Sequence, residues 1–212
     1  MNGPTRTPVT CDYSRVILTG FMGAGKTTLG GLLARRLGWD FADSDSLVEA
    51  QAGMTVGEIF LHRGEAAFRE MEAAAIHNAG AEERLVLALG GGALEAAATR
   101  AYLGSLTKTL IVFLDAPLEM LTARCVAEEK GAVRPVLADR GRLEERWKAR
   151  LPWYRQAHLT VDTSGRLPET VAESILGVLR ATGEDRIESA NESQGEAMKA
   201  SAGGREKRGA RA

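Results

Sequence analysis

A glycine-rich segment at residues 20–27 is the part of the chain whose residue types and spacing most clearly support chemistry. It reads Gly-Phe-Met-Gly-Ala-Gly-Lys-Thr and fits the pattern G-x-x-x-x-G-K-[ST] of phosphate-binding loops. Its glycines let the backbone turn tightly and aim N–H groups at a phosphate, while Lys26 adds a positive charge and Thr27 a hydroxyl suited to Mg²⁺. An apolar run at 15–19 and leucines at helical spacing at 28–37 predict the strand and the helix that such a loop joins. The alternative is a glycine-rich turn that only opens a helix.

Two carboxylates, Asp43 and Asp45, follow the second apolar run of the chain. In open α/β sheets, ligands bind at the carboxyl ends of the strands. Because the two side chains are one residue apart, we expect one to face a metal and phosphates and the other to face a phosphoryl acceptor. The third apolar run leads into glycines without an aspartate, so we expect Asp43, with Thr27, to bind the metal. The alternative for Asp45 is that it only caps the helix that follows.

A pair of charged residues and a run of glycines are candidates for binding the acceptor. Arg69 and Glu72 lie at i and i+3, on one face of a predicted helix. Glu72 can orient the Arg69 guanidinium toward a substrate carboxylate, although an exposed ion pair that contributes little is the alternative. Gly90, Gly91 and Gly92 follow a strand directly, so they either leave N–H groups free for a ligand that approaches closely or form a simple flexible turn.

A polar, glycine- and proline-containing stretch at residues 127–140 is predicted to be a mobile loop. Arg134 lies in it and Arg124 lies at its base. A charged loop that closes over phosphates excludes water and stabilises the charge on a transferring phosphoryl group. A solvated basic loop is the alternative. Arg150 follows in a segment where Pro152 is expected to end a helix.

The elements that must position these residues alternate between strand and helix. Helical patterns separate five short apolar runs, which predicts a three-layer α/β/α sandwich with a five-stranded parallel sheet covered on both faces. A helical insertion interrupts this alternation at about residues 45–80. Within it, Thr55 and Glu58 form a predicted capping box and Gly64 separates two helices. The five predicted strands are residues 15–19, 39–42, 85–89, 109–114 and 159–161.

Bulk composition predicts one ordinary domain and excludes some classes of partner. The chain has 212 residues, of which 44% are apolar, and a net charge of −1, so nothing favours a nucleic-acid or membrane surface. There is no apolar run long enough to span a membrane and no signal-peptide pattern at the N-terminus. Cys11 and Cys125 are predicted to be free thiols in a reducing cytoplasm. Residues 1–14 are expected to be flexible and residues 182–212 to be disordered.

Taken together, these motifs resemble those of the shikimate kinases, small members of the nucleoside-monophosphate-kinase-like P-loop superfamily. The resemblance covers residues 15–181, with an acceptor-binding insertion at about 45–80 and a mobile lid at about 125–141. Val136 replaces a leucine of the family pattern, and the lid is a little longer than in many members. The matching segments are Gly20–Thr27, Asp43-x-Asp45, Phe68-Arg69-x-x-Glu72, Gly90–Gly92, Arg134-Pro135-Val136-Leu137 and Arg150-x-Pro152-x-Tyr154.

The resemblance implies a phosphotransferase that uses ATP and Mg²⁺ to phosphorylate the 3-hydroxyl of shikimate, in the route to chorismate and the aromatic amino acids. It implies a cytoplasmic enzyme, which we expect to be a monomer, with Lys26, Asp45 and Arg134 as catalytic residues. Thr27 and Asp43 are the expected metal ligands. The expected ATP-binding residues are Gly23, Ala24, Gly25, Lys26, Thr27, Thr28, Arg124 and Arg134. The expected shikimate-binding residues are Asp45, Phe60, Phe68, Arg69, Gly90, Gly91, Gly92 and Arg150.

Three alternative functions share part of this pattern. Gluconate and nucleotide kinases have the same phosphate-binding loop, but a carboxylate acceptor calls for the two arginines Arg69 and Arg150 near Asp45. A GTPase requires an Asn-Lys-x-Asp tetrapeptide for guanine, and the sequence has none. A catalytically silent ATP-binding module is disfavoured because Lys26, Asp45 and Arg134 are all present.

Overall fold

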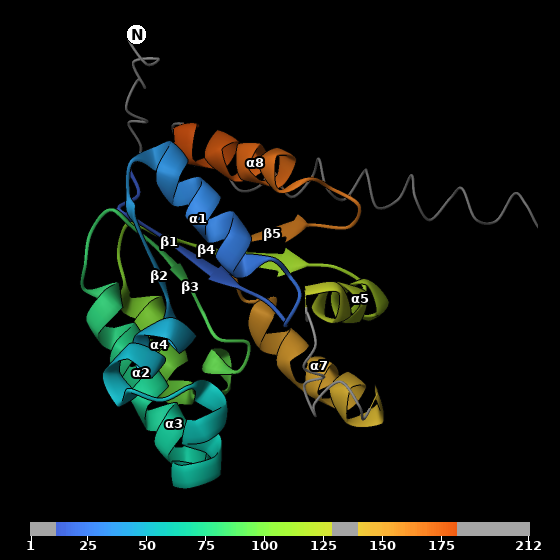
Figure 1. Cartoon of the computed structure of the whole chain (residues 1–212). Coiled ribbons are helices and arrows are strands. Elements are labelled where there is room, and N and C mark those ends of the chain that lie inside the picture. The colour runs from blue at the N-terminus through green and yellow to red at the C-terminus, as the bar shows by residue number, and fades with distance from the viewer. Residues whose placement is uncertain (1–11, 129–139, 182–212) are drawn as a thin grey trace, which may run out of the picture.

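The computed structural model describes residues 12–128 and 140–181 and shows a five-stranded parallel sheet between layers of helices (Figure 1). The strand order is β2-β3-β1-β4-β5, so the strand that leads into the glycine-rich loop is central. This confirms the predicted α/β fold class, and each strand lies within one residue of its predicted bounds. The strands are β1 (Arg15–Thr19), β2 (Asp40–Asp43), β3 (Leu85–Ala88), β4 (Thr109–Asp115) and β5 (Leu159–Asp162).

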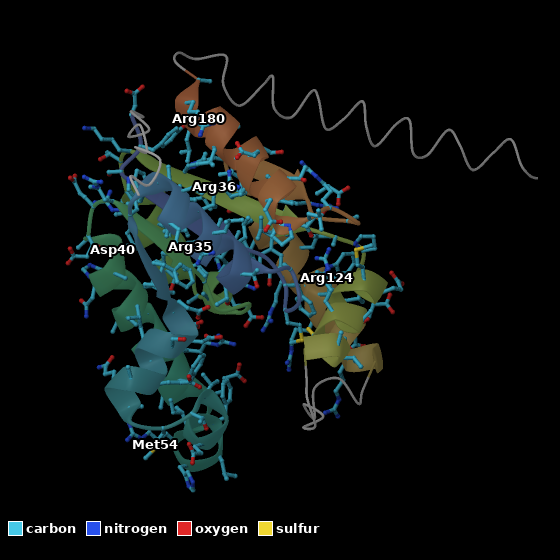
Figure 2. The ribbon with its side chains drawn as sticks, turned by 45° about the horizontal axis from the view of Figure 1, so that its top comes forward. Arg35, Arg36, Asp40, Met54, Arg124 and Arg180 are labelled. Atoms are coloured by element: carbon cyan, nitrogen blue, oxygen red, sulfur yellow. The ribbon has the colours of Figure 1, made fainter. Side chains whose placement is uncertain are left out.

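Helices cover both faces of the sheet because every parallel connection crosses over it. Helices α1 (Lys26–Leu37) and α8 (Pro168–Arg180) pack together on one face, and α4 (Ala97–Ser105) and α7 (Arg140–Tyr154) lie on the other (Figure 1). Arg36, labelled in Figure 2, forms an ion pair with Glu173 that joins α1 to α8. The remaining elements of this domain are α5 (Leu118–Glu128) and a short 3-10 helix, η1 (Ala93–Glu95).

The register of the sheet brings the predicted site residues to one edge. Leu18 pairs with Ala88 of β3 and with Val112 of β4, and Asp43 of β2 pairs with the same Ala88. The carboxyl ends of these strands are therefore level with one another. All of β3 and the middle of β1, Val16–Leu18, are apolar and buried, as a sheet covered on both faces requires. Residues at or just after the ends of β1, β2 and β3 line one cavity at this edge.

The helical insertion consists of α2 (Ser44–Ala52) and α3 (Val56–Gly80), and it carries a small apolar core of its own. Met54, labelled in Figure 2, lies in the turn between the two helices, at the end of the insertion far from the sheet. The predicted capping box of Thr55 and Glu58 is present, and Gly64 interrupts α3 with φ 82° and ψ 169°. The buried residues of this second core are Val48, Ile59, Phe68 and Ala75.

The ends of two predicted segments differ from expectation. The loop predicted at 127–140 is helical at both ends, because α5 continues to Glu128 and α7 begins at Arg140. Ser14, placed in the flexible N-terminal segment, is fixed by backbone hydrogen bonds to Lys108 and Arg84. Residues 129–139 of the lid, which include Arg134, lie outside the described residues, as do Cys11 and the predicted disordered tail.

Two further expectations, on the cysteines and on membrane-spanning helices, can be compared with the described part of the chain. Cys125 is buried and forms no disulfide with another described residue. No described helix has both the length and the apolar character needed to cross a membrane.

Candidate active site

The glycine-rich loop joins β1 to α1 and presents a helix N-terminus to the edge of the sheet. Gly25 is the N-cap of α1 and has φ 86°, a left-handed conformation that favours glycine. The first turn of α1 contains no acidic residue, so its free N–H groups and positive dipole end suit an anion. The Lys26 ammonium donates hydrogen bonds to the carbonyl oxygens of Gly20 (2.8 Å) and Phe21 (3.0 Å). Lys26 is thus folded over the loop that a phosphate would occupy.

Burial lowers the pKa of Lys26 to about 8, although the carboxylates of Asp45 and Asp43 act in the opposite direction. The ammonium group is withdrawn from water while the residue as a whole is only half-buried. Two backbone carbonyls compensate for the lost water only in part. An incoming polyanion would restore the stabilisation of the charged form.

Thr27 and Asp43, which the sequence predicts to be metal ligands, lie side by side. The Thr27 hydroxyl donates a hydrogen bond of 2.8 Å to Asp43 Oδ2, and the Asp45 backbone N–H donates one of 3.0 Å to Asp43 Oδ1. Asp43 is therefore the N-cap of α2, and the alternative interpretation, in which Asp45 caps this helix, is wrong. The backbone at Asp43 is still extended, as an N-cap requires, whereas Asp45 already lies in the first helical turn.

Lys26 and Asp45 face the same cavity, which has a volume of about 430 Å³. Burial raises the pKa of Asp45 above its ordinary value, and the neighbouring Asp43 carboxylate raises it further, while Lys26 and Arg69 oppose the shift. A carboxylate with a raised pKa is a better proton acceptor than a free aspartate. The cavity is lined by Met22, Gly23, Gly25, Lys26, Thr27, Thr28, Asp43, Asp45, Leu89, Gly90, Gly91 and Cys125.

The three glycines after β3 allow acidic and basic side chains to approach the backbone closely. A Cβ added at Gly90 would lie 2.5 Å from Asp45 Oδ1 and would also collide with Glu72. A Cβ added at Gly92 would collide with the Arg69 guanidinium. From the sequence, we expected the N–H groups of these glycines to be free for a ligand. For Gly90 this is wrong, because its N–H donates a 2.7 Å hydrogen bond to the buried hydroxyl of Ser44.

Arg69 and Glu72 form an ion pair of 2.7 Å between Nη1 and Oε2. It is not the exposed pair of the alternative interpretation, because the Glu72 side chain is only 2% exposed. Burial raises the pKa of Glu72, and Arg69 opposes this shift. The second Glu72 oxygen is buried against Gly90, with no hydrogen-bond partner among the described residues. Glu72 therefore holds the guanidinium beside the glycines, as predicted.

Arg150 reaches the same place from α7. Its guanidinium lies beside Gly91, and Tyr154, one turn later, donates a 2.5 Å hydrogen bond to the Gly91 carbonyl. Arg150 Nε donates to Glu95 Oε1 at 2.6 Å, and Arg69 Nη2 lies 3.8 Å from Glu95 Oε2. The two predicted arginines thus share one carboxylate. Glu95 was missed from the sequence, where the only signal is an acidic residue three positions after the glycines.

The two phenylalanines expected to form an apolar wall lie on α3, where their ring centroids are 4.8 Å apart and the ring planes are tilted by 32°. Phe68 is buried in the core of the insertion, and its ring lies 5.3 Å from the Arg69 guanidinium carbon. Phe60 is 37% exposed, so it has surface available to a ligand. Phe68 contributes mainly by supporting Phe60 and Arg69.

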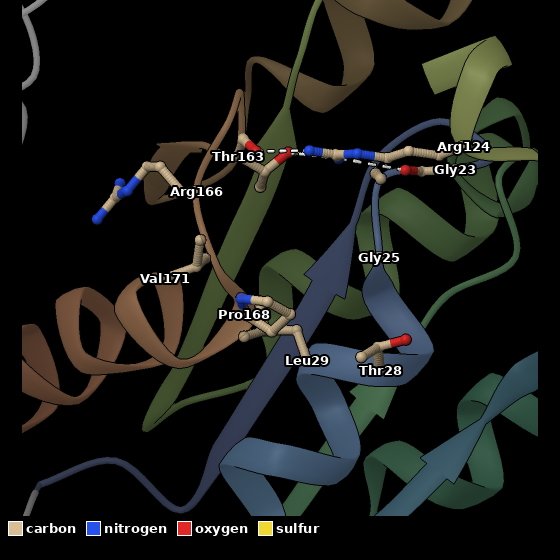
Figure 3. Close-up of a pocket in the computed structure, with 10 residues that line it drawn as sticks. Gly23, Gly25, Thr28, Leu29, Arg124, Thr163, Arg166, Pro168 and Val171 are labelled. Atoms are coloured by element: carbon tan, nitrogen blue, oxygen red, sulfur yellow. Dashed lines mark hydrogen bonds between the residues drawn. The ribbon is translucent and has the colours of Figure 1, made fainter. Parts of the chain in front are cut away.

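A second cavity, of about 220 Å³, adjoins the other side of the glycine-rich loop (Figure 3). Arg124 crosses one wall, where it donates to the Thr163 carbonyl (2.6 Å), to the Thr163 hydroxyl (3.0 Å) and to the Gly23 carbonyl (3.4 Å). Apolar side chains of α1 and α8 form much of the remainder. Sequence reasoning identified Arg124 but missed the lining residues Leu29, Thr163, Arg166, Pro168 and Val171.

Comparisons with known proteins agree with this geometry. The shikimate kinase family profile matches residues 22–180. A shikimate kinase of Geobacter sulfurreducens is 39% identical over 183 residues, which cover 85% of this chain and 98% of the relative. The solved shikimate kinase of Acinetobacter baumannii in complex with shikimate has 35% identity and a TM-score of 0.71, covering 78% of this chain and 92% of its own. A gluconokinase of Sinorhizobium meliloti, with 17% identity and a TM-score of 0.52 over 77% of this chain and 90% of its own, shares the fold alone.

Proposed function

This chain belongs to the shikimate kinase family, and we propose that it transfers the γ-phosphoryl group of ATP to the 3-hydroxyl of shikimate. The observation that carries the proposal is the single cavity that Lys26 and Asp45 share. A phosphate-binding loop forms one side of it, and Asp45, Gly90 and Gly91 form the other. The two arginines lie next to these glycines, Arg150 beside Gly91 and Arg69 beside Gly92.

The nucleotide is proposed to bind across the glycine-rich loop. Its β- and γ-phosphates lie on the N-terminal N–H groups of α1, and Lys26 exchanges its two backbone carbonyl partners for phosphate oxygens. The 220 Å³ cavity beside Arg124 takes the base, because it combines apolar side chains with a guanidinium. Arg134, in the lid, is proposed as a second cation for the transferring phosphoryl group.

The residues present also fit a magnesium ion. Thr27 and Asp43 place a hydroxyl and a carboxylate 2.8 Å apart at the edge of the phosphate site, and Mg²⁺ prefers such oxygen ligands together with water and substrate phosphates. When bound, the ion would neutralise charge on the phosphates. Among the described residues there is no cluster of three or more acidic, His or Cys side chains for a metal, which agrees with a site that substrate phosphates complete.

The acceptor is proposed to bind with its carboxylate toward Arg69 and Arg150 and its ring against Gly90, Gly91 and Phe60. Asp45 then lies where the 3-hydroxyl is presented to the γ-phosphate. Asp45 accepts the hydroxyl proton as the oxygen forms a bond to phosphorus, and the bond from phosphorus to the bridging oxygen of ADP breaks. Most of the rate follows from positioning and electrostatic stabilisation.

A coupled assay of ADP release with ATP, Mg²⁺ and shikimate tests the proposed function. We expect turnover with shikimate and none above background with gluconate or a nucleoside monophosphate. Equal turnover with those acceptors, or none with shikimate, would contradict the proposal. We further propose that the enzyme acts as a monomer in the cytoplasm, which sedimentation and cell fractionation can test.

A further inference from the structure

The charges around the two acceptor-side arginines show an imbalance that bears on how an acid enters. Three carboxylates pair with the two guanidinium groups: Glu65 at 3.2 Å and Glu72 at 2.7 Å from Arg69, and Glu95 on both Arg69 and Arg150. A substrate carboxylate would be a fourth. Like charges at such distances repel, so one of the three must leave before the acid can pair with the arginines.

Burial and contacts identify which carboxylate can leave. Glu72 is 2% exposed and enclosed, so it cannot reach water. Glu65 is 64% exposed, but it contacts Arg69 alone and does not approach Arg150. Glu95 is 40% exposed and spreads its two oxygens over both arginines, as the carboxylate of a bound acid would. Only Glu95 both occupies the position of the acid and has a route into solvent.

The backbone that carries Glu95 is fixed, so the side chain alone has to move. Arg100 donates hydrogen bonds to the carbonyls of Leu94 (2.6 Å) and Glu95 (2.8 Å) at the end of η1. Its guanidinium carbon lies 3.7 Å from the centre of the Trp153 ring, three residues after Arg150 on α7. Through Arg100, a cation–π contact thus fixes the backbone at Glu95 relative to the part of α7 that carries Arg150.

We propose that Glu95 stands in for the acceptor carboxylate. Its carboxylate neutralises Arg69 and Arg150 before the acid binds, and it rotates into water when the acid binds. An acceptor without a carboxylate does not displace Glu95 and leaves the arginines paired with it. The residue thus lowers the affinity of the site for the acid, whereas it changes the affinity for a neutral acceptor less. This inference rests on the proposed function.

Calorimetric titration of shikimate into the wild type and Glu95→Gln tests the inference. Glutamine keeps the size and an acceptor oxygen but removes the competing charge. We expect shikimate to bind about three- to tenfold more tightly, since a partly exposed ion pair is worth on the order of this factor. The Kd for ATP should not change, and KM for shikimate should fall without a rise in kcat. The methyl ester of shikimate, which has no charge, should gain less than the acid.

Glu65→Gln is the matched control, because it removes a carboxylate from the same Arg69 without touching Arg150. We expect its shikimate affinity to stay within about twofold of the wild type, as for an exposed pair. Unchanged or weaker binding of shikimate by Glu95→Gln overturns the inference, because Glu95 would then orient the arginines. Glu95→Ala serves in its place if the first variant does not fold. A wild type that neither binds nor phosphorylates shikimate contradicts the proposed function instead.

Discussion

The two sides of the active-site cavity are built in different ways. The phosphate side is a contiguous loop and the first turn of α1, and it offers a ligand mainly backbone N–H groups. The acceptor side is assembled from α2, α3, η1 and α7, and it offers charged side chains that pair with one another. The phosphate site is therefore a property of one short segment, whereas the acceptor site exists only when the whole domain is folded.

The two sides also differ in how their cationic side chains are paired. On the phosphate side, the Lys26 ammonium donates hydrogen bonds to two backbone carbonyls only, and its pKa is lowered. On the acceptor side, both arginines are already matched by carboxylates. The first site gains stabilisation when an anion arrives, while the second exchanges one anion for another. Nucleotide binding should thus respond to single charges more strongly than acceptor binding does.

The largest expected effect is at Asp45, where the two sides meet. Asp45→Asn should lower kcat by about 10²–10⁴-fold, the range for loss of a general base, with a smaller change in KM for shikimate. Asp43, not Asp45, caps α2, so the fold should persist. Steady-state kinetics with circular dichroism measures both. Asp40→Asn, at the exposed start of β2, is the matched control. Near-normal kcat in a folded variant would contradict the role of Asp45.

The next effect tests whether the phosphate side depends on its one lysine. Lys26→Met should raise the activation barrier by about 3–4 kcal/mol, as loss of a comparable charge stabiliser does, and should leave the Kd for shikimate within about twofold. The exposed Lys148, paired with Glu144, offers Lys148→Met as a control. Kinetics and calorimetry on the same preparations separate the two sides. A variant that keeps more than about a tenth of wild-type kcat would contradict the assignment.

On the acceptor side, Arg150→Ala should weaken shikimate by about 2 kcal/mol, roughly thirtyfold, and leave ATP affinity unchanged. The expected loss is at the low end for a buried charge pair, because Glu95 already neutralises part of the charge. Calorimetry with each ligand gives the two dissociation constants. Equal losses for both ligands would show that Arg150 is a structural residue.

Arg69→Ala sharpens the same comparison. It leaves the Glu72 carboxylate buried and unpaired, so Tm should fall as well as shikimate affinity. After Arg150→Ala, by contrast, the half-exposed Glu95 can be hydrated and Tm should change less. Thermal unfolding of the two variants side by side measures this difference. An equal Tm for both would show that Glu72 is hydrated in the variant.

The smallest effect is on pH dependence. Because the pKa of Lys26 is about 8 in the empty protein and phosphates raise it, ATP binding takes up a proton above pH 8. ATP affinity should fall by roughly fivefold between pH 8 and 9. The sign for stability is opposite. The unfolded chain holds this proton up to about pH 10.5, so the free energy of unfolding rises with pH between 8 and 10.5. Calorimetry in two buffers measures the proton uptake, and Lys26→Met should abolish it.

Local patterns were sufficient to predict the architecture and the phosphate side. The five apolar runs and the glycine-rich loop each encode an element in a few consecutive residues, and the sheet follows from their alternation. The capping box at Thr55 and the break at Gly64 were predictable for the same reason. The start of the predicted loop at 127 was wrong because Ala127 and Glu128 are strong helix formers, which continue α5 even where they are exposed.

On the acceptor side, a contact between two residues could be predicted only where both residues belong to the same sequence motif. Arg69 and Glu72 share a helix face, so their pair was predictable from spacing. Glu95 and Arg150 are 55 positions apart, and the hydroxyl of Ser44 meets the N–H of Gly90 46 positions away. Such contacts depend on where the sheet and α7 place each residue. The residues of α8 that line the nucleotide cavity were missed for the same reason.

The tripeptide Asp43-Ser44-Asp45 has a consequence for how the chain tolerates changes of length. Asp43 caps α2, the Ser44 hydroxyl accepts a hydrogen bond from the Gly90 N–H, and Asp45 lines the active-site cavity. Three separate contacts therefore depend on three consecutive residues. One inserted residue here would turn the following helical positions by about 100° and misalign two of the three. The turn at Met54 lies at the opposite end of the insertion from these three contacts. A change of length at that turn should therefore leave the active-site residues at the base of the insertion in place.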